Sequence, residues 1–486
     1  MKKGFDSKKY LKLQRDKIKE RINMFDKLYL EFGGKLIDDY HASRVLPGFK
    51  PDIKIDLLKE LKDICEVILC INANDIERNR MRADKNISYD IEVLRLIEFF
   101  RANNITINNV VITLFDNQQG VQKFINRLKE YHIKAYIHTF TKGYPTDVNT
   151  IVSEEGYGAN PYIETTKPLV VVSAPGACSG KLATSLSQLY HEHKRGIKAG
   201  YAKFETFPVW DLPLKHPVNI AYEAATADIN DKNMIDYFHL EKYGIPAINY
   251  NRDLEIFPVL KDILYKITNE TIYYSPTDMG VNVIGKCITD NSVVENACKE
   301  EIIRRYYKAL VDFKKGLVSK EVPERIKMLM NELNLDEKER TVVIKAREKK
   351  EKSSHPSACI CIGNKYICGR QTSLLSPISS TILNAIKTLT KIPDDVKLLS
   401  PKTLEPIINL KNNTYNFKEN TLKLNEVLLA LSICSVTNPI ISKSLENLSK
   451  LKGAELHATY IIPDSELTIL NNLGINTTCD SEANIN

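Results

Sequence analysis

The sequence predicts a multi-domain α/β protein whose N-terminal part carries a largely parallel sheet. Three observations support this prediction. The chain has 486 residues, too many for one ordinary core, which favours two to four domains. Buried-strand and helix patterns alternate between residues 66 and 140, as they do in parallel sheets covered by helices. A glycine-rich turn then joins another strand to a helix within residues 170–195.

Composition and charge narrow the class of protein. A hydrophobic content of 43% with 27% charged residues is typical of a globular chain, and no apolar run reaches bilayer length. The N-terminus is too charged for a signal peptide. The ten cysteines lack the paired spacing of a secreted disulfide framework, so we expect reduced cysteines in a cytoplasmic protein without a membrane partner.

The net charge of +7 is concentrated at one end of the chain. Residues 1–36 hold eleven Lys or Arg and five Asp or Glu. Acidic and basic residues are interleaved there, which favours a solvated helix face over a nucleic-acid contact. No nucleic-acid partner is therefore expected.

The elements follow in chain order. Helical spacing over 7–32, ended by Gly33 and Gly34, predicts one long helix. The alternating segments that come next predict strands at 66–71, 110–115 and 134–140 and helices at 89–104 and 118–132. A strand near 169–173 leads into a helix that Gly196 can end in a left-handed cap.

The second half of the chain is expected to be mainly helical from 255 to 350, with the charged run 345–357 as the clearest boundary. A hairpin turning at Gly363-Asn364 follows it. Beyond the hairpin we expect helices near 378–391, 421–434 and 439–451 and a strand at 455–462. The predicted domains are an N-terminal α/β domain at 1–254, a mainly helical middle domain at 255–350 and a C-terminal α/β domain at 351–486.

The turn between residues 174 and 181 is similar to a phosphate-binding loop but departs from its standard pattern. In G-x-x-x-x-G-K-[ST] the first glycine would stand at Pro175, and Leu182 occupies the hydroxyl position. Two glycines, a helix N-terminus and a lysine still favour a bound oxyanion, because amides and an ammonium converge there. The predicted phosphate-binding residues are Gly176, Ser179, Gly180, Lys181 and Thr184. The alternative is a ligand-free glycine-rich turn.

Catalytic and metal-binding candidates are more dispersed. Asp116 follows a predicted strand and could serve Mg²⁺ with a bound nucleotide, or could cap the next helix. Asp228 and Asp231, and likewise Asp236 and His239, share a face if their segment is helical, which would suit a divalent cation or a general base. A solvated helix with an aspartate N-cap is the favoured alternative.

Other polar residues are candidates for lining a pocket. They share short spacings or loop positions, and each also has an ordinary structural explanation as a cap, turn or connecting loop. They are Asp38, His41, Arg44, His191 and Asp278. Cys178 could act as a thiolate nucleophile in the loop, an assignment that the sequence does not favour. Cys359, Cys361 and Cys368 lack a C-x-x-C pair, which favours packing over zinc.

Long strings of the sequence resemble a bacterial protein family of unknown function. They include "YLEFGGKLIDDYHASRVLPGF", "CINANDIERNRMR" and "GYGANPYIETTKPLVVVSAPGACSGK", and the match runs from near residue 4 to near residue 475. The resemblance implies a multi-domain α/β fold with a helical middle part and a C-terminal part similar to the cytidine-deaminase-like three-layer sandwich. The family's loop resembles A-P-G-P-G-S-G-K, and here Ala177 and Cys178 replace its second proline and second glycine.

The resemblance carries no established activity with it. The zinc signature of deaminases is not present in the sequence, so similar topology implies no deaminase chemistry. The sequence thus predicts a protein that binds a phosphorylated small molecule or nucleotide, with phosphotransfer or phosphohydrolysis as the reaction class if it is an enzyme. The alternatives are a non-catalytic binding or scaffold protein and a metal-dependent hydrolase centred on 228–239. A homo-oligomer is compatible with the chain's size.

Overall fold

The computed structural model describes residues 2–34, 36–37, 39–82, 87–414 and 421–481. The chain divides into two compact units, residues 1–298 and 299–486. The predicted three-part division at 254 and 350 remains a prediction. One expected boundary does differ from the structure: the charged run after residue 345 continues the helix Thr341–Ser353 and is not a linker.

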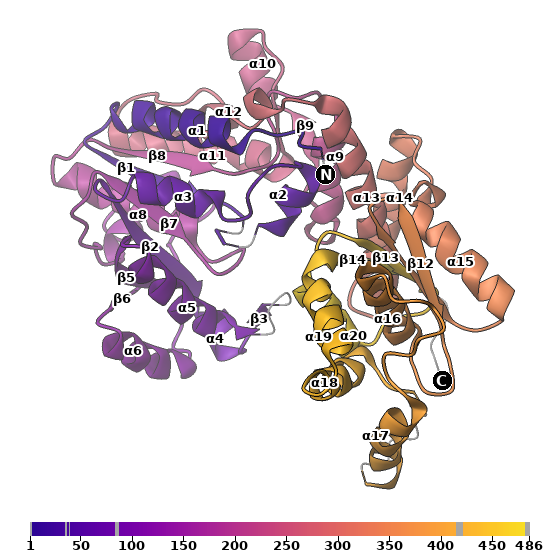
Figure 1. The fold of residues 1–486 in the computed structure, drawn as a ribbon. Helices are drawn as coiled ribbons and strands as arrows, with labels where there is room; N and C mark the ends of the chain where they lie inside the picture. The colour runs from indigo at the N-terminus through magenta and orange to yellow at the C-terminus, as the bar shows by residue number, and fades with distance from the viewer. Residues whose placement is uncertain (1, 35, 38, 83–86, 415–420, 482–486) are drawn as a thin grey trace. The chain divides into compact units, whose positions relative to one another are not determined.

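Unit 1 is built on an open six-stranded sheet in which every neighbouring pair is parallel (Figure 1). The strand order is β6-β5-β2-β7-β1-β8. The strands are β1 (Lys27–Phe32), β2 (Cys65–Asn72), β5 (Thr106–Thr113), β6 (Lys134–Ile137), β7 (Leu169–Ser173) and β8 (Ala199–Phe204). The predicted α/β class with a largely parallel sheet is confirmed.

Helices cover both faces of this sheet. Tyr29, Ile68 and Val170 pack in one core with α8 and α11, and their strand neighbours, such as Leu28 and Val67, are equally buried on the opposite face. There α1, α3 and α5 lie over the sheet (Figure 1). The helices of unit 1 are α1 (Ser7–Ile22), α2 (Tyr40–Val45), α3 (Ile53–Glu60), α4 (Ala73–Glu77), α5 (Tyr89–Ala102), α6 (Gly120–Glu130), α7 (Val148–Ile151), α8 (Lys181–Lys194), α9 (Pro217–Ala225), α10 (Tyr237–Tyr243), α11 (Asn251–Thr268) and α12 (Pro276–Met279).

The long helix predicted for 7–32 is wrong in its second half. Helix α1 ends at Ile22, and Lys27–Phe32 is β1, a strand inside the sheet with all six residues buried. Because β1 is buried on both faces, its two charged residues, Lys27 and Glu31, do not alternate regularly with apolar ones, and their spacing of four also fits a helix. Two short antiparallel pairs, β3 (Met81–Arg82) with β4 (Ile87–Ser88) and β9 (Asn233–Ile235) with β10 (Ile248–Tyr250), complete unit 1.

Unit 2 contains a four-stranded sheet of order β12-β11-β13-β14. Ala358 and Ile360 of β11 face the larger core, whereas Cys359 between them packs with Val342 and Ala346 of α15. Helices therefore cover both faces of this sheet as well. Its strands are β11 (Ser357–Ile362), β12 (Lys365–Arg370), β13 (Glu455–Ala458) and β14 (Asn476–Cys479).

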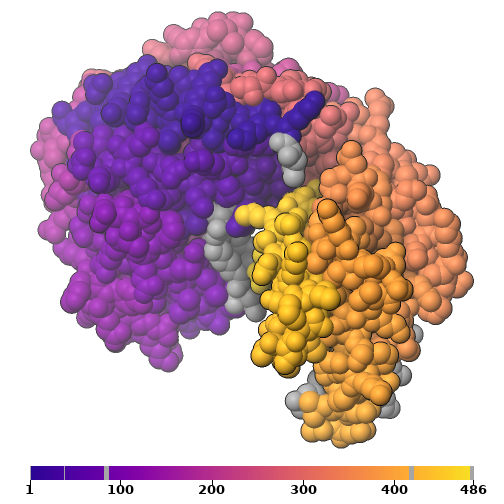
Figure 2. Space-filling model, in the orientation of Figure 1, coloured from indigo at the N-terminus to yellow at the C-terminus, as the bar shows by residue number. Residues whose placement is uncertain are grey.

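The remaining helices are α13 (Asn291–Lys314), which crosses the division between the units, α14 (Glu321–Glu332), α15 (Thr341–Ser353), α16 (Pro377–Thr390), α17 (Pro401–Asn413), α18 (Leu424–Ser435), α19 (Pro439–Glu446) and α20 (Asp464–Asn472). Helix α17, which the sequence did not predict, lies at the margin of unit 2 (Figures 1 and 2).

The hairpin at Gly363-Asn364 is confirmed, since Ile362 pairs with Lys365 across a two-residue turn. The expectation that all cysteines are reduced is wrong for one pair. Cys359 and Cys368 stand directly opposite each other on β11 and β12, and they form a disulfide. Directly opposed positions of an antiparallel pair bring two Cβ atoms close enough to be bridged.

Candidate functional site

The sheet of unit 1 has a topological switch point at the carboxyl ends of β7 and β1. These strands are neighbours, but the chain leaves β1 toward β2 and leaves β7 toward β8, in opposite directions along the sheet. Right-handed crossovers then put the following helices on opposite faces. In open α/β sheets, ligands bind in the crevice that opens at such a point.

The predicted phosphate loop lies at this point, between the end of β7 and the start of α8. Gly180 is the N-cap of α8 and has a left-handed backbone with φ of 78°. A Cβ there would lie 2.9 Å from the side chain of Thr113, and one at Gly176 would lie 2.5 Å from the Tyr89 hydroxyl. Packing alone therefore explains both glycines.

Packing does not account for the unused hydrogen-bond donors of the loop backbone. Residues 177 and 178 form a turn between Gly176 and Ser179, and within the described residues no hydrogen-bond acceptor is found for the backbone N–H groups of residues 176–178 and 180. The loop is instead fixed through its oxygens and side chains: Thr113 donates to the Ser179 carbonyl at 2.9 Å, and the Ser179 hydroxyl donates to the Gly176 carbonyl at 3.0 Å. The donors of a turn at a helix N-terminus thus remain available to an anion.

Lys181 opens α8 beside these amides. Its side chain is 14% exposed, and its nearest carboxylate is Glu31 on β1 at 3.8 Å, beyond hydrogen-bond distance. Among the described residues, no acceptor lies within hydrogen-bond distance of its ammonium group. The ammonium group of this mostly buried side chain can therefore complete its hydrogen bonds with a ligand or with solvent.

Thr184, the last predicted loop residue, is fully buried one turn into α8. Its hydroxyl accepts a long contact of 3.6 Å from the Cys70 thiol, and its amide donates to the Gly180 carbonyl. It therefore belongs to the packing of the helix. Cys178 is exposed, with a φ of 56°.

Charged residues also lie at the carboxyl ends of the neighbouring strands β1 and β8. The Tyr201 hydroxyl donates to Glu31 at 2.8 Å. Lys203 donates to Asp253 of α11 at 2.6 Å and lies 3.2 Å from Glu205. Burial lowers the pKa of Lys203, but the three carboxylates around it raise that pKa above its ordinary value.

Glu31, Lys203 and Glu205 were not among the residues predicted from the sequence. The stretch containing Glu31 was assigned to a helix, and no element was predicted for 199–204. The signal that could have found them is a short run of apolar residues ending in a charged residue, in "KLYLEF" and again in "AGYAKFE". Such runs are typical of strands that end at a site.

Among the described residues, no hydrogen bond or ion pair joins Asp116, Asp228 or His239 to the loop. Asp116 follows β5 and is exposed; it does not cap α6, whose N-cap is Gln119. Asp228 is exposed in a short 3₁₀ turn, so it does not share a helix face with Asp231, which pairs with Arg252 at 3.4 Å.

The segment around His239 matches the structural alternative. Asp236 is the N-cap of α10 and accepts a hydrogen bond from the His239 amide at 3.0 Å. The His239 ring lies 3.1 Å from the Ser275 hydroxyl. Asp278 accepts from the amides of Tyr274 and Ser275 and closes a capping box in α12. Within the described part of the chain, no group of three His, Cys, Asp or Glu residues could hold a metal ion.

The other described pocket candidates lie on α8 and α2. His191 is ten residues beyond Lys181, about 15 Å along the helix at 1.5 Å per residue, and its ring contacts the Asn160 carbonyl at 2.7 Å. His41 on α2 packs edge-on against Phe207. Arg44 lies in the last turn of α2. Asp38 lies outside the described residues.

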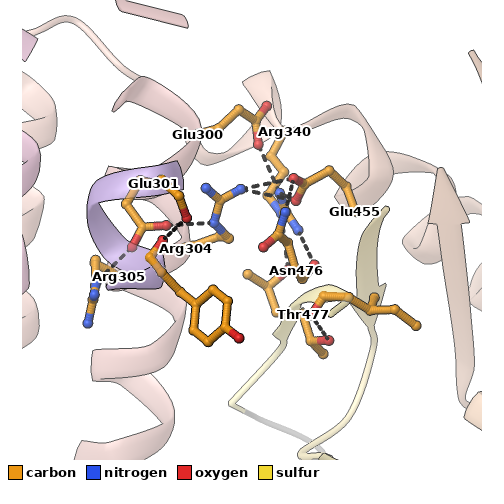
Figure 3. A network of polar contacts seen from close by, with 12 residues as sticks. Glu300, Glu301, Arg304, Arg305, Arg340, Glu455, Asn476 and Thr477 are labelled. Carbon is orange, nitrogen blue, oxygen red and sulfur yellow. Dashed lines mark hydrogen bonds and ion pairs between the residues drawn. The ribbon is translucent and has the colours of Figure 1, made fainter. Parts of the chain in front are cut away.

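A second polar cluster lies within unit 2 (Figure 3). The Arg340 side chain is 1% exposed and contacts Glu300, Glu455 and Thr478. It also donates to the backbone carbonyls of Leu456 and Asn476. This guanidinium is saturated by the protein itself, so the cluster holds the unit together and offers no open ligand site.

The fold defines a mixed α/β protein whose larger unit is an open parallel sheet covered on both faces. Family models identify it further: residues 3–334 match the domain of unknown function DUF1846, N-terminal, and residues 338–484 match its C-terminal counterpart. The chain belongs to this family, in agreement with the resemblance found in the sequence.

Curated relatives agree with this assignment. The chain is 54% identical over 489 residues to a UPF0371 protein of Clostridium botulinum strain Langeland, covering 99% of this chain and 97% of the relative. It is 54% identical over 492 residues to a UPF0371 protein of Clostridioides difficile strain 630, covering 99% and 98%. Within the described residues, no helix is long and apolar enough to cross a membrane.

Proposed function

We propose that this protein binds the phosphate group of a small molecule, a nucleotide or another phosphorylated metabolite, at the turn between β7 and α8. The observation that carries the proposal is a set of donors without acceptors among the described residues: the backbone amides of residues 176–178 and 180, and the ammonium group of Lys181, whose side chain is 14% exposed. They lie at the topological switch point, where α/β sheets bind ligands. An oxyanion would satisfy these donors together.

The reaction class suited to such a site is phosphoryl transfer or hydrolysis, because amides and an ammonium stabilise charge that develops on phosphate oxygens. A non-catalytic binding protein is the second candidate. It is favoured by the positions of Asp116, Asp228 and His239, none of which has a hydrogen bond or ion pair to the loop among the described residues. The similarity of unit 2 to a cytidine-deaminase-like sandwich is likewise a proposal, supported by its helices on both faces of a four-stranded sheet.

Thermal shift against nucleotides, sugar phosphates and pyrophosphate tests the binding proposal. A ligand at 100 times its Kd should add about 2.7 kcal/mol to the stability of the folded protein. Lys181→Ala should weaken binding about tenfold or more, since a hydrogen bond to a charged group contributes about 1.5–3 kcal/mol.

Lys194→Ala is the matched control. Lys194 ends the same helix, and its exposed side chain pairs with Glu154. Retention of every ligand-induced shift by Lys181→Ala would refute the site. A turnover assay on the bound ligand then separates an enzyme from a binding protein.

A further inference from the structure

The carboxyl end of β8 holds a partly buried carboxyl group, Glu205, that the proposed phosphate site leaves without a role. Its side chain is 21% exposed and packs against Gly33, where a Cβ would lie 2.4 Å from the Glu205 Cγ. Because Gly33 directly follows β1, Glu205 lies on the strand neighbouring Glu31, the residue nearest the Lys181 ammonium.

Glu205 shares its counter-ion. Lys203 lies 3.2 Å from Glu205 but donates its hydrogen bond to Asp253 at 2.6 Å. Among the described residues, the ion pairs of this group join three carboxylates (Glu31, Glu205 and Asp253) to two ammonium groups, those of Lys181 and Lys203. Arg252 and Asp231 pair with each other and leave this excess of one negative charge unchanged.

Several elements contribute charged groups around Glu205, including α3, whose Lys54 donates to the Gly33 carbonyl and pairs with Asp39. Burial raises the pKa of Glu205, Asp253 and Glu31 raise it further, and Lys203 and Arg252 lower it. The hydroxyls of Tyr201, Tyr222 and Tyr250 also lie within its electrostatic reach. The next residue, Thr206, is 5% exposed, and its hydroxyl has no hydrogen-bond partner among the described residues. The end of β8 thus concentrates polar groups that the protein itself does not match.

We propose that Glu205 is the proton-exchanging group of this site: it takes up a proton from solvent when a phosphate binds at the loop, and its carboxylate form opposes that binding. This inference rests on the proposed function. Bringing an anion to a strand edge where one carboxylate is already in excess among the described residues favours protonation of a partly buried carboxyl group that shares its counter-ion, as Glu205 does. By linkage, the factor by which a bound anion favours protonation of Glu205 equals the factor by which protonation of Glu205 strengthens anion binding.

The proton resides on a Glu205 carboxyl oxygen and returns to solvent when the ligand leaves, so no other reactant is needed. At an effective dielectric constant of about 20, two charges about 10 Å apart change an affinity roughly tenfold. The proposal therefore predicts an effect of that size.

The Kd for inorganic pyrophosphate, measured by calorimetry from pH 5 to pH 8.5, tests this proposal in the full-length protein. The wild type is compared with Glu205→Gln, which keeps the shape of the side chain and removes its charge. Titration of pyrophosphate itself is common to both proteins and cancels in the ratio of their Kd values. That ratio, wild type over variant, should rise from about one at acid pH to about ten at alkaline pH.

Glu154→Gln is the control, because Glu154 is an exposed carboxylate that pairs with Lys194 at the far end of α8. The ratio of Kd values, wild type over Glu154→Gln, should stay near one at every pH. A constant ratio for Glu205→Gln, with pyrophosphate binding intact, overturns the role of Glu205 and leaves the phosphate site standing. Failure of pyrophosphate and every other phosphorylated ligand to bind the wild type at any pH overturns the proposed function and this inference with it.

A second measurement uses only the wild type and so tests the proposal even if Glu205→Gln fails to fold. Ligand-induced difference infrared spectroscopy on the wild type should show the band of a protonated carboxyl group growing as pyrophosphate binds at neutral pH. A spectrum with bound ligand and no such band contradicts the proposal.

Discussion

At the residue scale, the contact between Lys181 and Glu31 shows how a carboxylate can position an ammonium group without forming a hydrogen bond to it. A contact of 3.8 Å orients the ammonium through charge but leaves its hydrogen-bond donors unused. Glu31 itself is anchored by the Tyr201 hydroxyl at 2.8 Å. The carboxylate therefore competes with an incoming anion for Lys181 while keeping the lysine beside the loop.

This competition predicts that Glu31→Gln tightens phosphate binding by about threefold, because weak ion pairs are worth up to about 1 kcal/mol. The amide oxygen of glutamine can still accept from Tyr201, so the strand end should keep its packing. Calorimetric titration with pyrophosphate at pH 7 measures the change. Glu60→Gln, which alters an exposed partner of Arg15, serves as the control. Weaker binding by Glu31→Gln would mean that the carboxylate assists the ligand and does not oppose it.

At the element scale, the sequence predicted the alternating strands and helices of unit 1 and the turn that precedes α8. Residues 65–137 and 169–194 follow the predicted order with small shifts in their ends. It failed at β1, because this strand, buried on both faces, has no regular polar alternation, and Tyr29 falls at a spacing that also fits a helix. It also placed a boundary in "KAREKKEKSS", which is the polar surface of α15.

The misassigned β1 explains why half of the candidate site was missed. The loop residues could be predicted because glycine and lysine act within one local segment. Glu31, Lys203 and Glu205 meet the loop only through the strand order β7-β1-β8, which is a long-range property of the sheet. Local patterns contain no information on which strands become neighbours, so the dispersed candidates Asp116, Asp228 and His239 were chosen in their place.

The start of α8 gives a prediction about stability. Gly180→Ala places a side chain at a φ of 78° and brings its Cβ to 2.9 Å from Thr113. A left-handed backbone costs a non-glycine residue about 1–2 kcal/mol, and the clash adds to it. Gly196→Ala is a matched control, since its φ is 77° but a Cβ would meet no atom within 4 Å. Urea denaturation should show the larger loss for Gly180→Ala by about 1 kcal/mol or more. Equal losses would mean that the loop shifts freely away from Thr113.

At the scale of the whole molecule, the two units rely on different polar chemistry. Unit 1 leaves amides and an ammonium unmatched at one sheet edge, whereas the inner ion pairs of unit 2 saturate each other. In unit 2, Asp480 accepts from Arg347 at 2.7 Å and lies 3.3 Å from the buried ring of His457. Such contacts serve stability, and their effect depends on pH.

Asp480 gives the prediction for this scale. Burial by itself raises the pKa of Asp480, but the contacts with His457 and Arg347 outweigh it and lower that pKa from 3.8 to about 2. The folded protein thus keeps Asp480 charged where the unfolded chain binds a proton. The resulting stabilisation is complete above pH 3.8, at most about 2 kcal/mol, and it is lost as pH falls toward 2.

Asp480→Asn should therefore lower the free energy of unfolding by up to about 2 kcal/mol at pH 7. The gap to the wild type should narrow between pH 4 and pH 2, because only the wild type loses this contribution there. Urea denaturation at pH 7, 4 and 3 measures both effects. Asp464→Asn, which removes an exposed partner of Lys315, should leave stability nearly unchanged at each pH. A gap for Asp480→Asn that stays constant down to pH 3 would show that the carboxylate stabilises unit 2 through packing and not through its charge.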